Sequence, residues 1–307
     1  VQIIGILCAF FGTFLALKYL SSMLPKDAGR EFAHDGKKSA GKPRGAGLIF
    51  ILAFGIVAML FGKFNWEILI YLVLTIASML TGYLDDASKN PWGEFKKGAL
   101  DLLIACLVAG TYLAFNGSEI FINILGESIV LNPIVFFILA VILVWVSINV
   151  TNCTDGVDGL SGTLSVITLF TIYLLESVKG TNSAINYITL ILIVCVLAYL
   201  WFNATPSKLM MGDAGSRALG IFISIAILKT GSPLLYIPVA LMLIIDGGLG
   251  LLKISFRRFL KIEILNNVRT PIHDHVRKKN EWSNTQVVFR FAIIQIIISF
   301  CVIYLIK

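Results

Sequence analysis

Long apolar runs, separated by short polar segments, cover most of the chain. A helix needs about 20 mostly apolar residues to cross the hydrocarbon of a bilayer. No segment between the runs is long enough to bury a core of its own, so we expect an all-α, polytopic membrane protein in which residues 1–307 form one domain. The pattern predicts ten transmembrane helices, at residues 2–20, 46–62, 66–84, 98–115, 132–150, 160–176, 185–203, 214–229, 234–252 and 286–306.

The composition supports lipid as the solvent. The chain is 57% hydrophobic and only 14% charged, whereas a soluble domain is about 45–50% apolar and about 25% charged. The first apolar run lacks a basic segment before it and is followed by further runs, so we interpret it as a span and not as a signal peptide. The five cysteines form no CxxC pair, and their pattern predicts neither a disulfide framework nor a zinc site.

The basic residues predict the orientation in the membrane. Most of the 25 lysines and arginines fall in the odd-numbered loops between the predicted spans, with the largest group between Lys253 and Lys279. Lys63, Lys179 and Lys229 are the lysines of the even-numbered loops. Because cytoplasmic loops carry the excess of Lys and Arg, we expect the odd loops in the cytoplasm and both termini outside. The net charge of +7 could suggest binding to nucleic acid. Its distribution argues instead that the basic residues orient the protein in the membrane and attract anionic substrates.

Carboxylates gather at the cytoplasmic ends of the spans. Three polar groups stand there: Asp85-Asp86, Asn152 to Gly159, and Met211 to Ser216. A carboxylate next to the membrane is costly unless it is solvated, paired or used. Mg²⁺ prefers carboxylate and phosphate oxygens, and a metal offsets the repulsion between phosphates that are brought together. The groups therefore predict a site for a divalent cation and phosphates; the alternative is that Asp158 and Asp213 cap helices.

The ninth loop contains two of the three histidines, His273 and His275, on either side of Asp274. A zinc site would need more His or Cys ligands than this loop offers. Contact with a phosphate or a sugar is the better interpretation, because a histidine can donate hydrogen bonds in either charge state.

The ordered set of these segments resembles a known family, the polyprenyl-phosphate N-acetylhexosamine-1-phosphate transferases. The resemblance rests on Gly82 to Asp86, Asn152 to Leu160 and Met211 to Ser216. Within the family, Pro271 to His275 resembles the PLHHH motif, and Trp282 to Phe291 resembles the stretch that follows it in the phospho-N-acetylmuramoyl-pentapeptide transferases. The similarity runs from about the second predicted span to the end of the chain.

This resemblance implies a reaction and a setting. Phospho-MurNAc-pentapeptide would pass from UDP-MurNAc-pentapeptide to undecaprenyl phosphate, giving lipid I and UMP in peptidoglycan synthesis. The resemblance also implies ten spans, dependence on Mg²⁺, an active site on the cytoplasmic face of the bacterial cell membrane, and a homodimer.

The resemblance also implies roles for individual residues. Asp213 would bind Mg²⁺, and Asp85 and Asp86 would lie near the lipid phosphate, one of them acting as base. His273 would be catalytic. Substrate-binding positions would be Lys97, Asn149, Asn152, Asp155, Asp158, Met210 and His275.

The chain also departs from the family pattern. Asp274 replaces the middle histidine, and Met210 stands where an aromatic residue often stacks on uracil. The segment between Asp86 and Lys97 is short, so Lys89 or Lys96 are alternatives to Lys97. Direct attack of the carrier phosphate and a two-step route through an aspartyl-phosphate both remain open.

Two other functions compete with this hypothesis. A sister enzyme would transfer GlcNAc-1-phosphate or a related sugar phosphate to the same carrier, and the ninth loop argues against it. An ion-coupled transporter would use carboxylates near the bilayer midplane at broken helices. Among the aspartates, only Asp101 and Asp246 lie within predicted spans, and the others lie at the cytoplasmic ends or in the cytoplasmic loops, so this placement favours the enzyme.

Overall fold

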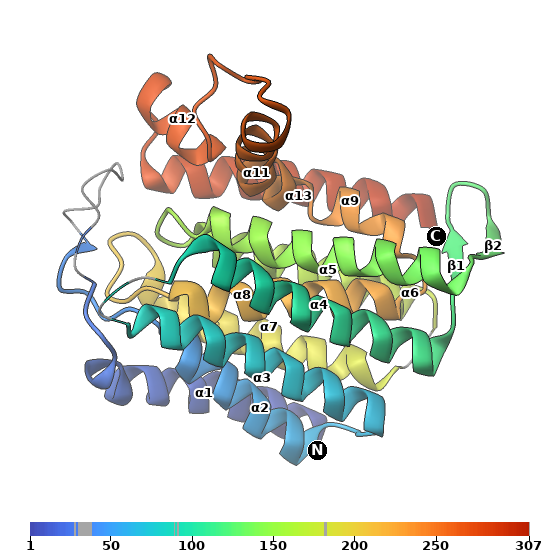
Figure 1. Cartoon of the computed structure of the whole chain (residues 1–307). Helices are drawn as coiled ribbons and strands as arrows, with labels where there is room; N and C mark the ends of the chain where they lie inside the picture. The colour runs from blue at the N-terminus through green and yellow to red at the C-terminus, as the bar shows by residue number, and fades with distance from the viewer. Residues whose placement is uncertain (28, 30–38, 89, 91, 181–182, 307) are drawn as a thin grey trace.

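The computed structural model describes residues 1–306 apart from 28, 30–38, 89, 91, 181 and 182, and most of what it describes is helix. Long helices run side by side (Figure 1). Helices suit a lipid environment because the backbone polar groups are paired within the helix. They are α1 (Gln2–Leu20), α2 (Gly47–Phe61), α3 (Trp66–Asp86), α4 (Glu94–Asn116), α5 (Pro133–Thr154), α6 (Leu160–Val178), α7 (Ala184–Asn203), α8 (Gly212–Lys229) and α13 (Asn284–Ile306). A short 3₁₀ helix, η1 (Ser21–Met23), extends α1.

The prediction of a helical, polytopic membrane protein is confirmed. Among the described residues, seven helices are long and apolar enough to cross a membrane, and a bent pair of helices adds an eighth candidate. The helix α2 is apolar but shorter. The helix α8 is buried at every residue from Gly212 to Leu228, so its charged side chains face protein and not lipid.

The predicted span at 234–252 is bent and is not one continuous helix. The chain there bends by 69° between Pro233–Val239 and Leu241–Leu260. Pro238 lies at the end of the first part, and a proline interrupts the hydrogen bonds of a helix. The buried amide of Gln295 compensates: its oxygen accepts from Met242 N at 2.9 Å, and its Nε2 donates to Pro238 O at 3.1 Å.

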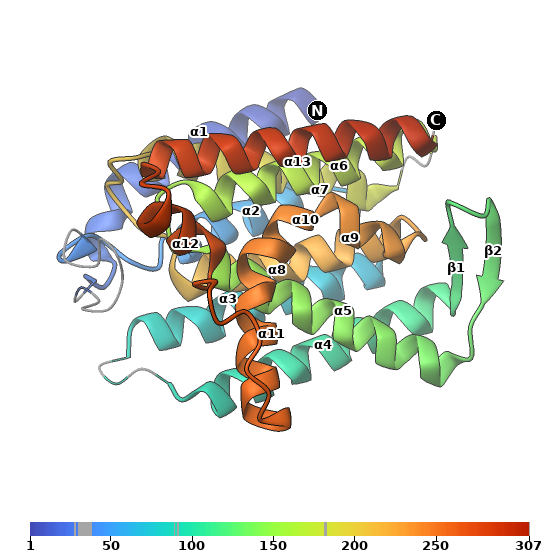
Figure 2. The same cartoon turned by 90° about the horizontal axis from the view of Figure 1, so that it is seen from above.

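The bent segment is built from several short pieces. These are η3 (Pro233–Leu235), α9 (Tyr236–Val239), α10 (Leu241–Leu243), the π-helical turn η4 (Ile244–Gly248), α11 (Leu249–Ser255) and a second π-helical turn, η5 (Phe256–Leu260). Figure 2 shows α11 running across the direction of the long helices. A short helix, α12 (Ile272–Lys279), then precedes α13.

The structure contains a two-stranded hairpin between α4 and α5, which the all-α prediction did not include. Strand β1 (Glu119–Ile122) pairs antiparallel with β2 (Glu127–Val130), with Glu119 opposite Val130. The hairpin lies at one end of the bundle (Figure 1). Strands this short carry too little alternation to be distinguished from a loop in the sequence.

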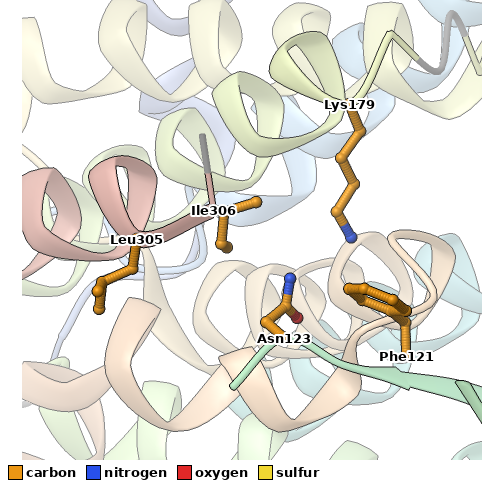
Figure 3. Close-up of a pocket in the computed structure, with 5 residues that line it drawn as sticks. All are labelled: Phe121, Asn123, Lys179, Leu305 and Ile306. Atoms are coloured by element: carbon orange, nitrogen blue, oxygen red, sulfur yellow. The ribbon is translucent and has the colours of Figure 1, made fainter. Parts of the chain in front are cut away.

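Both ends of the chain lie at the hairpin end of the bundle. Gln2 O accepts a hydrogen bond from Tyr187 Oη at 2.9 Å, at the start of α7. A cavity of about 410 Å³ at the same end is lined by Phe121, Asn123, Lys179, Leu305 and Ile306 (Figure 3). The described parts of the predicted odd-numbered loops lie at the opposite end of the bundle (Figure 1), so the cavity is remote from the predicted site residues.

Candidate active site

A lysine joins two aspartates where α3 ends and α8 begins. Lys97 Nζ lies 3.1 Å from Asp213 Oδ2 and also contacts Asp85 Oδ2. The other oxygen of Asp85 accepts from Trp92 N at 2.7 Å. Lys96 Nζ instead lies 3.4 Å from the centroid of the Trp92 ring, so of these two lysines Lys97 is the one that contacts the aspartates. Lys89, the other alternative, lies outside the described residues.

Asp86 is held from two sides. One oxygen lies 2.9 Å from Arg44 Nε, and the other accepts from Ala214 N at 3.1 Å in the first turn of α8. Carboxylates are stabilised at a helix N-terminus by the unpaired N–H groups and the helix dipole. Gly212 permits this approach: its φ is +70°, and a Cβ there would lie 2.3 Å from Asp86 Oδ2.

Arg44 connects three aspartates and was not predicted as a site residue. Besides Asp86, its guanidinium lies 3.6 Å from Asp213 Oδ1 and 3.5 Å from Asp27 Oδ1. Burial lowers the pKa of Arg44, but the charges of the aspartates outweigh this and raise the pKa above its ordinary value. Arg44 lies in the first loop, and its place among the basic residues of the odd-numbered loops was the available signal.

Backbone pairing places Met210 beside Arg44. Met210 N donates to Pro43 O at 2.8 Å, and Ala46 N donates to Met210 O at 3.0 Å. The first loop and the loop before α8 are therefore joined directly at the site. This joint brings residues far apart in the chain to the same cluster of acids.

The end of α5 supplies the two predicted asparagines. Asn152 Nδ2 donates to Ser216 Oγ at 2.9 Å, which ties α5 to α8. Asn149 Nδ2 donates to Trp145 O at 2.8 Å within its own helix. Asp155 follows as the residue that ends α5, and it is half-buried.

The helix-cap alternative for Asp158 and Asp213 is wrong. The residue that caps α6 is Gly159, and Asp158 Oδ2 accepts instead from Ser207 N at 3.1 Å, in the loop before α8. The residue that caps α8 is Met211, without a side-chain hydrogen bond, and Asp213 lies inside the first turn. Both carboxylates therefore contact other segments.

His273 is clamped by a carboxylate that was not predicted as part of the site. Asp246 Oδ1 accepts from His273 N at 2.7 Å, and Asp246 Oδ2 lies 2.8 Å from the ring nitrogen Nδ1. The side chains of both are buried, at 3% and 0% exposure for His273 and Asp246. The opposite ring nitrogen faces the loop after α5, where a Cβ on Gly156 would lie 2.4 Å from Nε2.

His275 does not share this contact. Residues two apart on a helix point in different directions, and His275 Nδ1 accepts from Arg269 N at 3.1 Å. Asp274, between the two histidines, lies 3.4 Å from Arg277 Nη1 in the same helix. The structure therefore brings His273 to the aspartate-bearing loop and leaves His275 on a separate contact.

The position of Asp246 within a predicted span already marked it as a functional candidate, but it was not predicted as a site residue. An ionisable residue within a predicted span is a functional candidate by default. Asp246 was considered only for the transporter alternative. Its partner, His273, lies 27 residues further along the chain, and no periodicity links the two positions.

The carboxylates of the site can be compared with the ligands that Mg²⁺ usually takes. The described residues contain no group of three His, Cys, Asp or Glu side chains arranged to hold a metal ion. Mg²⁺ is usually bound by one or two carboxylates together with substrate phosphates. Asp213 and Asp85, which share the ammonium of Lys97, fit that requirement.

Comparison with known proteins places the chain in a family. The model of glycosyl transferase family 4 matches residues 68–231. Phospho-N-acetylmuramoyl-pentapeptide-transferase of Treponema pallidum (strain Nichols) is 38% identical over 310 residues, with 95% of this chain and 85% of the relative covered. The chain belongs to this family of transferases.

More distant relatives cover the same length. The phospho-N-acetylmuramoyl-pentapeptide-transferase of Dictyoglomus turgidum is 30% identical over 313 residues, with 95% of this chain and 94% of the relative covered. That of Dictyoglomus thermophilum is 29% identical over 304 residues, with 94% and 93% covered. The predicted resemblance is confirmed, and this member of the family is a phospho-sugar transferase in a membrane.

Proposed function

We propose that this transferase moves phospho-MurNAc-pentapeptide from UDP-MurNAc-pentapeptide to undecaprenyl phosphate, releasing UMP and forming lipid I in peptidoglycan synthesis. The observation that carries the proposal is the ammonium of Lys97 between Asp85 and Asp213, at the end of a membrane-spanning bundle. Relatives across almost the whole chain bear the name of that activity.

The charges of the cluster suit a reaction between two phosphates. Asp85, Asp86 and Asp213 face the cations Lys97 and Arg44, which leaves negative charge for a divalent cation to balance. Asp213 and Asp85 would hold Mg²⁺, whose chemistry is to neutralise phosphate charge as the leaving UMP departs. Lys97 and Arg44 would attract the phosphates as they approach.

We assign the two neighbouring aspartates different roles. Both oxygens of Asp86 are engaged by Arg44 and by Ala214 N, so Asp86 holds the guanidinium and the start of α8 in place. Among the described residues, one oxygen of Asp85 contacts only Lys97, a long side chain with 30% exposure. Asp85 is therefore the carboxylate that would face the carrier phosphate.

The remaining site residues would contact the nucleotide and the sugar. Uridine would bind at the loop after α5, where it would contact Asn152 at the end of that helix and Asp155 and Asp158 in the loop. Asn149 and Met210 would add further contacts. His273 would contact the diphosphate or the sugar through Nε2, because Asp246 occupies Nδ1. His275 would be a peripheral substrate contact.

The topology belongs to the same proposal. Ten spans, both termini outside and the site at the cytoplasmic face agree with two observations: both chain ends lie at the hairpin end, and the basic loops lie at the other end. We also propose one catalytic domain, a homodimer, and the bacterial cell membrane as location, as the family resemblance implies.

Release of UMP by purified protein in detergent tests the function. The assay contains undecaprenyl phosphate, Mg²⁺ and either UDP-MurNAc-pentapeptide or UDP-GlcNAc. We expect UMP with the pentapeptide donor alone, its loss in EDTA, and its return with added Mg²⁺. Asp213→Asn should stay inactive at every Mg²⁺ concentration. Release with UDP-GlcNAc alone would favour the sister enzyme, and no release from folded protein would contradict the proposal.

A further inference from the structure

A second ion pair lies one helical turn deeper in the bundle than the Lys97–Asp213 pair. Arg217 Nε donates to Asp101 Oδ1 at 3.1 Å, and Arg217 Nη2 contacts the same oxygen. Asp101 is four residues after Lys97 on α4, and Arg217 is four residues after Asp213 on α8. Residues four apart lie on the same face of a helix, so the two helices present a square of alternating charges.

Stability alone does not account for this pair. Arg217 is 2% exposed and Asp101 is 3% exposed, so both charges are withdrawn from water. A buried ion pair is often replaced by apolar residues of similar volume without loss of stability, because desolvation offsets the attraction. Charged side chains inside membrane spans are rare and usually serve function.

Each member of the pair is a potential competitor for the site. Asp101 carries a negative charge one turn from Lys97, and Arg217 carries a positive charge one turn from Asp213. Within a low-dielectric interior, an unpaired charge is drawn strongly to the nearest opposite charge. Without Arg217, Asp101 would attract Lys97; without Asp101, Arg217 would attract Asp213.

We propose that Asp101 and Arg217 are positioning residues that neutralise each other and so leave Lys97 and Asp213 free to face the substrate phosphates and the metal. The inference rests on the proposed roles of Lys97 and Asp213. It assigns no chemical step to the deeper pair. Its consequence is that the pair matters as a unit, and that removing both charges is less harmful than removing one.

The experiment is a double-mutant cycle of Asp101→Leu, Arg217→Leu and the double variant. We expect each single variant to lower kcat about tenfold or more, and the double variant to recover to within about threefold of wild type, as coupled neighbours do. Binding of Mn²⁺ without substrate, measured by electron paramagnetic resonance, adds a readout independent of turnover. Asp101→Leu should weaken Mn²⁺ binding, Arg217→Leu should not, and the double variant should restore it.

A matched control exists at the other end of the same helix α8. Lys229 Nζ lies 2.9 Å from Glu67 Oε2, and in this pair Glu67 is buried while Lys229 is half-buried. Glu67→Leu, Lys229→Leu and their double variant should change thermal stability but leave the Mn²⁺ affinity and the kcat of the folded protein unchanged. Thermal unfolding of every variant shows which of them fold.

The outcomes separate this inference from the proposed function. Wild-type protein that releases no UMP would contradict the function itself. Active wild type with a double variant as impaired as the single variants, or with single variants that keep wild-type kcat and Mn²⁺ binding, would overturn the positioning role. If a leucine variant fails to fold, Asp101→Asn and Arg217→Gln repeat the cycle with smaller changes in shape.

Discussion

Substituting Gly156 with alanine places a methyl group against the ring of His273. A Cβ on Gly156 would lie 2.4 Å from Nε2 and 2.8 Å from Cε1 of that ring. The backbone of Gly156 is not in the left-handed region, so alanine is disfavoured by contact and not by conformation. The substitution therefore tests one thing, the placement of the histidine against the loop after α5.

The size of the effect follows from how far the ring must move. Ordinary contact begins at 3.4 Å, so relief from 2.4 Å requires a shift of about 1 Å. A shift of the ring disturbs its 2.8 Å contact with Asp246. A misplacement of about 1 Å costs on the order of 100-fold in rate, while overpacking costs about 1–3 kcal/mol of stability. We expect kcat to fall about 100-fold in Gly156→Ala protein that still folds.

The assay is UMP release under saturating donor, together with thermal unfolding in detergent. Gly12→Ala is the matched control, because a Cβ on Gly12 meets nothing within 4 Å, on a helix far from the site. A cycle with His273→Ala separates two causes. If the ring is the obstacle, Gly156→Ala should add no further loss once the ring is gone.

Two results would refute the reasoning. Folded Gly156→Ala protein with wild-type kcat would show that His273 does not need its observed place. An additional large loss in the His273→Ala background would show that the methyl group obstructs the substrate instead of the ring.

The contacts of Lys97, Asp246 and Glu67 lead to three further predictions. Lys97→Met should lower kcat about 100-fold, the scale of losing one charge-stabilising donor, whereas Lys96→Met should retain nearly wild-type kcat; equal losses would contradict the assignment of the site lysine. Asp246→Asn should lower kcat at least about tenfold, because one buried acceptor is lost, and wild-type kcat would contradict the clamp. Glu67→Gln should lower the free energy of unfolding by about 1.5–3 kcal/mol, the scale of losing a hydrogen bond to a charged group, because buried Glu67 pairs with half-buried Lys229. The kcat of the folded protein should not change, and the exposed Glu127→Gln should change neither quantity. Unchanged unfolding of Glu67→Gln would exclude a stabilising role.

Some expectations failed where packing outweighed local pattern. The run at 234–252 is apolar enough for a straight span, but its free backbone groups at the bend are satisfied by Gln295, a residue of another helix. Asp158 precedes an apolar helix as a cap would, yet its carboxylate accepts from Ser207 N. In each case the partner is distant in sequence, so no local rule predicts it.

The positions of the long helices, and the gathering of aspartates at one end of the bundle, followed from the sequence alone. Both depend on local properties: a run must be long and apolar to cross lipid, and charge must stay at the ends of the runs. The aspartates at those ends were therefore identified before their geometry was known. Lys97 was named only through the family resemblance, and the structure then placed it between Asp85 and Asp213.

Only the tertiary structure decided which charges meet. The links of Asp86 to Arg44, of His273 to Asp246 and of Asp101 to Arg217 each join different helices or loops. A buried charge is stable only beside a partner, but the sequence does not state which of many distant partners the fold delivers. The identity of the acids is thus a property of the chain, while their pairing is a property of the packed bundle.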